Sequence, residues 1–189
     1  MAKGSQKMIE LIRKVYLKIL MYIDPIRAAR KKGVKIRGGA HILGTVSFGS
    51  EPWLITIDEG VLITKGVTFM THDGSVSTIR KLSPKYSRVQ KFGFIHIKKN
   101  AFVGNDAYIL PNITVGENAI VGARSVVTRD VPDNAVVAGV PAKVICTVEE
   151  LAEKYLANTP EYDDWHSIQE KMKTTEMIAV YARENKQNN

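Results

Sequence analysis

The sequence predicts a mainly β fold, a solenoid of short parallel strands with helices at both ends. The main observation is a period of six residues between Ile97 and Pro132. Neither a helix nor an ordinary alternating strand gives such a period. The second observation is that the period stops at both ends, where helical patterns take over. A short period kept over six units indicates coils, in which each strand stacks on the strand one full coil away.

The N-terminal arm, roughly Ser5 to Lys32, is predicted to be helical and amphipathic. Its apolar residues recur at helical spacing with basic residues between them. Pro25 should end or kink this helix. No uncharged apolar run is long enough to span a bilayer. Two interpretations stay open: the helix packs across the end of the solenoid or against a sister subunit, or it contacts an anionic membrane surface.

The basic charge of the chain is concentrated in this arm. The whole chain has a formal net charge of +8, whereas residues 1–37 hold eleven Lys or Arg against two acidic residues and therefore carry +9. No recognised nucleic-acid-binding motif accompanies this charge. The single Cys146 excludes an internal disulfide and is typical of a reducing compartment. We expect a cytoplasmic protein, at the inner face of the membrane if the arm binds lipid.

Each place in the six-residue unit has its own chemistry. The first place is always aliphatic, which suits the interior, and the fifth is small or β-branched, which leaves room for the first. The fourth place favours Asn and Asp, which tolerate a left-handed backbone at a corner. Its occupants are Asn100, Asp106, Asn112, Asn118, Arg124 and Asp130. The repeat begins near Ile36, slips by three residues through Glu51, Pro52 and Trp53, and resumes at Ile57.

The repeat is broken at two consecutive positions. In the resumed units the fourth place is Gly60, then Gly66, then His72, and Asp73 follows at a fifth place that is otherwise small or aliphatic. Histidine tolerates the positive φ expected at such a corner. Local rules tend to be violated at functional sites, so His72 and Asp73 are candidate catalytic residues. The alternative is that a coil simply ends here and a polar loop begins.

An insert at residues 74–92 interrupts the period. It contains five cations and no acidic residue, and a loop of this length is usually functional or disordered. The cations favour an anionic ligand such as a phosphate group. A solvated arm that grips a neighbouring subunit is an equal alternative. Candidate contacts to the substrate or to its anionic group are Glu51, Lys81, Lys85 and Arg88.

The C-terminal segment is predicted to form two helices. The run TVEELAEKYL from Thr147 indicates a short helix, and Thr159-Pro160-Glu161 predicts the start of a second that ends near Arg183. The chain then divides into an N-terminal helical arm at 1–33, a solenoid domain at 34–146 and a C-terminal helical extension at 147–189.

The motif THDG with its basic insert, together with the run VVTRDVPDNAVVAGVPAKVI, resembles the hexapeptide-repeat, acetyl-CoA-dependent O-acetyltransferases. The resemblance covers about residues 34–146. It is strongest to acyltransferases of capsule and O-antigen synthesis and to maltose and galactoside acetyltransferases. It implies a left-handed parallel β-helix of triangular section and a homotrimer with active sites between subunits. It also implies transfer of an acetyl group to a hydroxyl of a sugar or glycan.

The resemblance also implies roles for single residues. His72 matches the family's general base, with Asp73 orienting it; Asp58 or Glu59 in the preceding coil could serve instead. Positions that contact acetyl-CoA in related enzymes correspond here to Asn105, Ala123, Thr128, Arg129 and Lys143.

The sequence leaves one other activity open and argues against another. An N-acetyltransferase acting on an amino-sugar nucleotide stays open as the alternative. The histidines at 41, 72, 96 and 166 include no close pair, so we expect no catalytic zinc and no metal requirement.

Overall fold

The computed structural model describes residues 2–187, and the side chains of residues 6–185. The chain divides into two compact units that meet between Cys146 and Thr147, and each is described by itself. The first unit holds every strand and the N-terminal helices. The second unit holds two helices, α4 (Val148–Leu156) and α5 (Ile168–Gln187).

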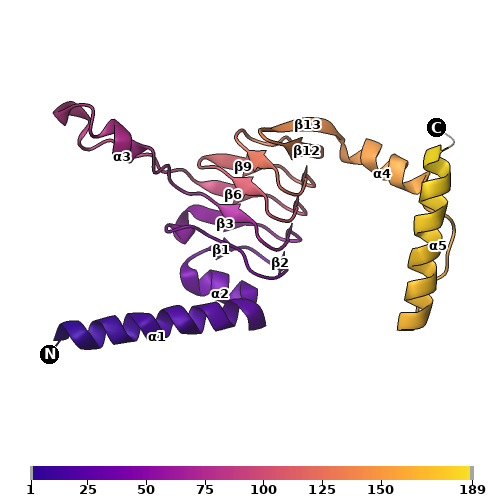
Figure 1. Ribbon diagram of the computed structural model, residues 1–189, viewed down its shortest axis with the longest axis horizontal. Coiled ribbons are helices and arrows are strands. Elements are labelled where there is room, and N and C mark those ends of the chain that lie inside the picture. The colour runs from indigo at the N-terminus through magenta and orange to yellow at the C-terminus, as the bar shows by residue number, and fades with distance from the viewer. Residues whose placement is uncertain (1, 188–189) are drawn as a thin grey trace. The chain divides into compact units, whose positions relative to one another are not determined.

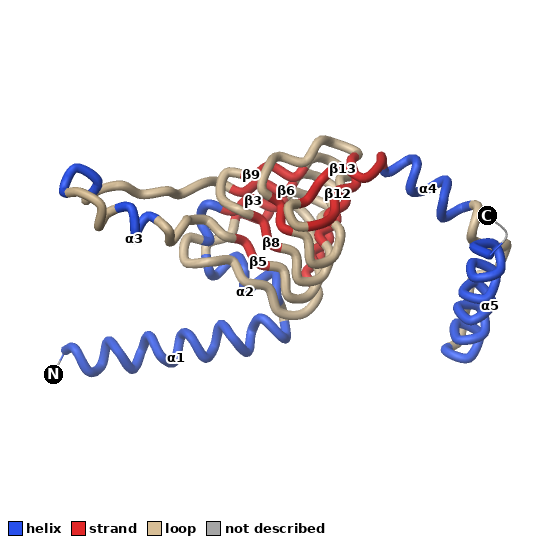
Figure 2. The backbone as a smooth tube through the Cα atoms, turned by 45° about the horizontal axis from the view of Figure 1, so that its top comes forward, coloured by secondary structure: helices blue, strands red, loops and turns tan. Residues whose placement is uncertain are grey.

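The strands of the first unit form three parallel sheets. The first sheet has the order β1 (Lys35–Ile36), β3 (Ile55–Ile57), β6 (Ile95–Ile97) and β9 (Ile113–Val115). The second has the order β13 (Ala142–Thr147), β12 (Ala135–Gly139), β10 (Ile120–Val121), β7 (Phe102–Val103), β4 (Leu62–Ile63) and β2 (His41–Ile42). The third has the order β11 (Val126–Val127), β8 (Tyr108–Ile109) and β5 (Thr68–Phe69). They are the three walls of a left-handed β-helix, and Figure 2 shows the loops that join them at the edges.

The interior of the coil agrees with the predicted places of the repeat. The first-place residues from Ile97 to Val127 are all at most 1% exposed, and the fifth-place residues from Ala101 to Val131 at most 4%. Each branched side chain therefore fits against a small or β-branched one inside the coil. The predicted fold class is confirmed.

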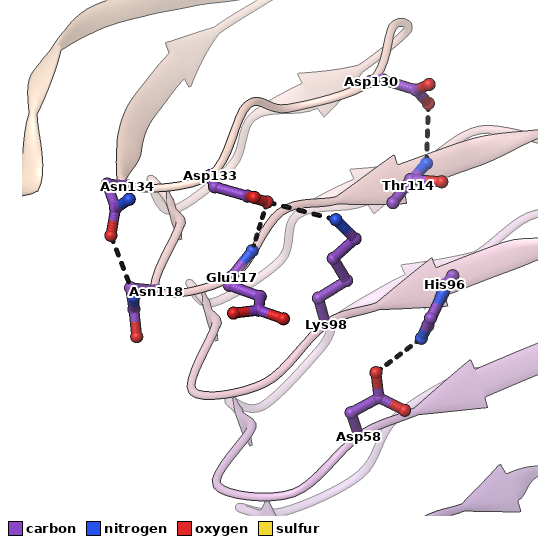
Figure 3. A network of polar contacts seen from close by, with 9 residues as sticks. All are labelled: Asp58, His96, Lys98, Thr114, Glu117, Asn118, Asp130, Asp133 and Asn134. Atoms are coloured by element: carbon purple, nitrogen blue, oxygen red, sulfur yellow. Dashed lines mark hydrogen bonds and ion pairs between the residues drawn. The ribbon is translucent and has the colours of Figure 1, made fainter.

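The edges of the coil contain the predicted left-handed residues. Five of the six fourth-place residues have φ between 54° and 65°, namely Asn100, Asp106, Asn112, Asn118 and Arg124. Asp130 is the exception; its carboxylate accepts a hydrogen bond from the backbone N–H of Thr114 at 2.7 Å (Figure 3). At one edge the asparagines form a ladder. Asn100 donates to Asn118 at 3.2 Å. Asn118 in turn donates to Asn134 at 2.9 Å (Figure 3).

Two departures from the regular coil lie below this ladder. Regular coils have 18 residues, as in the pairing of Ile95 with Ile113. His41 pairs with Leu62, 21 positions along the chain, so this coil holds three additional residues. They belong to the predicted slip and form the 3-10 helix η1 (Pro52–Leu54). The next coil is lengthened further by the insert.

The insert leaves the coil as a hairpin-like loop (Figure 2). At its base His72 forms an antiparallel bridge with Phe92, and the Gly93 N–H donates to the Thr71 carbonyl at 2.9 Å. It contains α3 (Val76–Ile79) and η2 (Pro84–Tyr86). His72 is not among the residues with positive φ, so the expectation of a left-handed corner at His72 is wrong. The reason is that the chain here runs outward beside the returning strand instead of turning the corner.

The carboxylate of Asp73 ties the two ends of the insert together. It accepts a hydrogen bond from the Ser75 N–H at 3.0 Å and one from the Lys91 ammonium at 3.1 Å. These hydrogen bonds, with Ser75 first and Lys91 second, lower the pKa of Asp73 from 3.8 to about 2.

Two helices cover the N-terminal end of the coil. They are α1 (Ala2–Ile23) and α2 (Pro25–Lys32), and α2 lies between α1 and the first strands (Figure 1). The predicted break at Pro25 is confirmed, since the side chain of Asp24 caps α2 by accepting from the Arg27 N–H at 2.9 Å. None of the helices in the described part of the chain is both long and apolar enough to cross a bilayer.

The second C-terminal helix begins later than predicted. Residues 159–161 are not helical, and α5 starts at Ile168. Ser167 accepts from the Glu170 N–H at 3.2 Å, and the Glu170 carboxylate accepts from the His166 N–H at 2.7 Å. These two hydrogen bonds fix the start of α5 at Ile168, because Ser167 satisfies one of the first backbone donors of the helix.

The anchoring of the insert should depend on pH through Asp73. Between pH 3.8 and about 2 the folded carboxyl stays ionised while the unfolded one binds a proton, so its contribution to stability is lost as the pH falls through that range. Asp73→Ala should therefore lower the thermal midpoint at neutral pH, and the difference from the wild type should close towards pH 2. Asp164→Ala, which removes an exposed aspartate of the second unit, is the control. A difference that persists at pH 2 would contradict this account.

Candidate active site

A histidine and a glutamate from successive coils meet at one edge of the β-helix. We call this the insert edge; it joins the sheet of β5, β8 and β11 to the sheet of β3, β6 and β9. Nδ1 of His72 lies 2.9 Å from Oε2 of Glu51. Glu51 directly precedes η1, and His72 lies two residues before the insert, at its base. Both residues thus stand where the regular repeat is interrupted.

The pairing fixes which nitrogen of His72 is available for chemistry. An ionised carboxylate only accepts hydrogen bonds, so Nδ1 must carry the proton that it donates to Glu51. In the neutral ring Nε2 then has a free lone pair. Within residues 2–187 no side chain or backbone group forms a hydrogen bond to Nε2, and the His72 side chain is 44% exposed. Nε2 can therefore accept a proton from a bound molecule.

Glu51 is held in its ionised form by its neighbours. Its carboxylate is only 17% exposed, and the same Oε2 accepts a second hydrogen bond from the hydroxyl of Thr71 at 2.6 Å. Burial alone would raise the pKa of Glu51, but the hydrogen bonds from Thr71 and His72 outweigh burial and hold the pKa below its ordinary value. The ionised carboxylate fixes the orientation and the tautomer of the imidazole.

Sequence reasoning missed two residues of this cluster. Thr71 is fully buried beside His72, and the hydroxyl of Ser50 lies 3.5 Å from Nδ1 of His72. The three-residue slip through Glu51 was the available signal, because it marks an irregular coil directly beneath the insert. Phe92 adds an aromatic ring on the other side of His72, with ring centroids 6.1 Å apart.

The expectation that Asp73 orients His72 does not agree with this geometry. Asp73 pairs with Lys91 and Ser75 at the base of the insert, as described above. The alternative acid Asp58 is also engaged elsewhere. Its Oδ2 lies 2.7 Å from Nε2 of His96 (Figure 3), and its Oδ1 lies 3.7 Å from Nη1 of Arg37. Glu59 is exposed and follows the C-terminal end of β3, whereas Glu51 precedes the N-terminal end of that strand. The carboxylate in contact with His72 is Glu51, which sequence reasoning had placed among the substrate contacts.

The five candidate acetyl-CoA residues fall into two groups on the surface of the coil. Asn105 and Ala123 are stacked at the edge between the sheet of β7 and β10 and the sheet of β8 and β11, where the Asn105 carbonyl accepts from Arg124 N–H at 2.7 Å. Thr128 and Arg129 lie on the insert edge. Arg129 and Lys143 line one hollow of about 260 Å³, together with apolar residues of β11, β12 and β13. Two cations therefore converge at the upper end of the coil.

The candidate anion-binding residues of the insert do not lie beside His72. Lys81, Lys85 and Arg88 are exposed on the projecting part of the loop, and the Lys85 ammonium lies 4.7 Å from the centre of the Tyr86 ring. Arg80 instead braces the hairpin by donating to the Val89 carbonyl at 2.8 Å. Within the described chain the insert contributes Lys91 and Phe92 to the surroundings of the site.

Comparison with known proteins agrees with the coil and its edges. Residues 94–129 match the model of the bacterial transferase hexapeptide family (six repeats). Protein CapG of Staphylococcus aureus is 43% identical over 149 residues, which cover 78% of this chain and 85% of that protein. Galactoside O-acetyltransferase of Escherichia coli (strain K12) is 35% identical over 106 residues, which cover 56% of this chain and 50% of that protein.

Among solved structures, serine acetyltransferase from Brucella abortus strain S19 in complex with coenzyme A is 27% identical, with a TM-score of 0.45. The superposition covers 61% of this chain and 40% of that chain, and an alignment this partial supports no functional conclusion. The identity to Protein CapG extends over most of both chains. The chain therefore belongs to the hexapeptide-repeat acetyltransferases.

Proposed function

We propose that the protein transfers the acetyl group of acetyl-CoA to a hydroxyl of a sugar, in the synthesis of a surface polysaccharide such as a capsule or O-antigen. The observation that supports this most directly is the orientation of His72. Glu51 holds its Nδ1, which leaves an exposed Nε2 able to accept a proton. The O-acetyltransferase among the relatives agrees with a hydroxyl acceptor.

The proposed chemistry needs one residue that moves a proton and a second residue that holds the first in place. Acetyl-CoA, when bound, supplies the acetyl group as a thioester. Nε2 of His72 takes the proton of the acceptor hydroxyl as that oxygen attacks the thioester carbonyl. The imidazolium then returns the proton to the departing sulfur, and Glu51 stabilises its positive charge in the interval. No net proton is gained or lost by the protein.

The cations at the upper end of the coil fit the anionic end of acetyl-CoA. Coenzyme A carries a diphosphate and a 3′-phosphate, which favour Arg and Lys partners. Arg129 lies on the insert edge two coils above His72 and shares its hollow with Lys143. This arrangement supports a cofactor that runs along the edge with its thioester towards His72.

A homotrimer would complete the site. Asn105 and Ala123 lie on a different edge from Thr128 and Arg129, and the sheet of β5, β8 and β11 separates the two edges. One chain cannot place both groups against one narrow ligand. We propose that the Asn105 edge of one subunit faces the insert edge of the next, so that each site lies between two subunits.

Replacing His72 tests the proton-transfer role. His72→Ala should lower kcat about 10²–10⁴-fold, because general-base catalysis contributes about that much, while the Kd for acetyl-CoA stays unchanged. Turnover can be followed by thiol release from acetyl-CoA with a panel of sugars, and binding by calorimetry. His166→Ala, in the second unit, is the control. A mild effect on kcat would favour the alternative, an N-acetyltransferase that acts on an amino-sugar nucleotide.

Replacing Glu51 tests whether it positions His72. Glu51→Gln keeps an acceptor for the buried hydroxyl of Thr71 but removes the negative charge, so the fold should survive. We expect kcat to fall about tenfold or more, since outer-shell partners of this kind typically contribute 10–100-fold. The KM for both substrates should change little. Glu59→Gln is the matched control, and an equal fall in kcat for both variants would reject the positioning role.

Replacing Arg129 and Lys143 tests the cofactor assignment. Arg129→Gln and Lys143→Gln should each raise the KM for acetyl-CoA about tenfold, because a hydrogen bond to a charged group contributes about 1.5–3 kcal/mol. Neither change should affect acetyl-pantetheine, which lacks the nucleotide phosphates. Lys99→Gln, on another edge of the coil, controls for the loss of general positive charge. Equal losses with both acetyl donors would exclude a phosphate-binding role.

A further inference from the structure

Helix α1 has two apolar faces, and the fold uses only one of them. Leu20 and Met21 are buried in the same core cluster as Ala28 and Ala29 of α2. Leu17 is half-buried on this side. These residues account for the attachment of α1 to the coil. They do not account for the rest of its apolar residues.

The second face of α1 is exposed over almost its whole length. Nine apolar residues are between 43% and 76% exposed, namely Met8, Ile9, Leu11, Ile12, Val15, Tyr16, Ile19, Tyr22 and Ile23. At 100° per residue they fill a continuous arc of about 160°, on the side of the helix opposite Leu17 and Met21, and Leu20 borders one margin of the arc. Soluble proteins rarely leave a continuous apolar surface of this size uncovered, so it marks an interaction site.

The charges of α1 indicate what kind of surface covers this face. Lys7, Lys14 and Lys18 lie along one margin of the arc, and Arg13 lies beyond the other margin. Glu10 is the only acidic residue in the sequence of α1, and it lies on the side opposite the arc. An apolar face with cationic margins complements a surface that is apolar inside and anionic outside.

A hollow beside the arc strengthens this argument. It has a volume of about 320 Å³ and lies between α1 and α2. It is lined by Leu11, Val15 and Leu17 together with Lys14, Lys18 and Lys32. Burial lowers the pKa of Lys32, so an anionic group in the hollow would favour its charged form. Apolar and cationic groups converge here in the way that a phospholipid headgroup and its first methylenes require.

We infer that α1 attaches the protein to the surface of an anionic phospholipid bilayer. The helix lies in the plane of the interface, with the apolar arc among the acyl chains and the lysines at the level of the phosphates. A second copy of this chain is a poorer occupant, because neither margin of the arc carries an acidic residue that could pair with the lysines of the other copy. This inference does not depend on the proposed reaction.

Vesicle sedimentation of the full chain tests the attachment. The protein should sediment with vesicles of phosphatidylcholine and phosphatidylglycerol, sediment much less with phosphatidylcholine alone, and be released by salt. Replacing Lys7, Lys14 and Lys18 together by Gln should weaken partitioning about 100-fold, since each lysine near an anionic surface contributes about 1 kcal/mol, or about fivefold. Lys154→Gln with Lys173→Gln, two exposed lysines of the second unit, should have no effect.

A second variant separates the membrane from a protein partner. Ile12→Gln with Ile19→Gln, at the centre of the arc, should abolish partitioning while leaving the oligomeric state and the thermal midpoint unchanged, because both side chains are exposed. Light scattering with size-exclusion chromatography gives the oligomeric state. Absence of binding to anionic vesicles would overturn the inference. So would a smaller oligomer for this variant, which would assign the arc to a contact between copies of the chain.

Discussion

The structure depends on how closely its coils stack. Each first-place Ile or Val lies against the small or β-branched fifth-place residues, and both sets are almost completely buried. A fully buried Val or Ile contributes about 1.5–3 kcal/mol relative to an exposed one, so a coil cannot gain or lose residues inside a wall. Extra residues can leave only at an edge. The chain does this twice, through η1 and through the insert.

Both irregularities leave at the same edge in successive coils, and this brings Glu51 and His72 together. Met70 donates to Ile109, and Leu110 donates to Val127, so the rows above them on the same edge remain regular. The rigid coil thus gives the pair a fixed floor, while Asp73 and Lys91 close the base of the insert beside it. The proposed catalytic residues are held by backbone ladders on both sides and not by a free loop.

The two His–carboxylate pairs among the described side chains show why geometry decides their roles. His72 is held through Nδ1 and keeps Nε2 exposed, at an edge where Arg129 and Thr128 lie above it. His96 is held through Nε2 by Asp58, on the outer face of the first sheet beside Arg37. In His96, Nε2 is the ring nitrogen furthest from the backbone, and its contact with Asp58 means that it is not free. The same residue types therefore leave Nε2 exposed in one place and hydrogen-bonded to a carboxylate in the other.

The sequence by itself determined the coil, because a six-residue period with fixed interior and corner chemistry is satisfied by one kind of stacking. It also located His72, the left-handed asparagines and the helix break at Pro25. The tertiary structure alone decided which acid contacts His72. Glu51 is 21 positions earlier in the chain, and it comes beside His72 only when the two coils are stacked. Asp73, adjacent in sequence, turns to Lys91 because the outgoing chain pairs with the returning one. The exposed arc of α1 likewise followed only from packing, since the sequence shows that the helix is apolar but not which of its faces the coil covers.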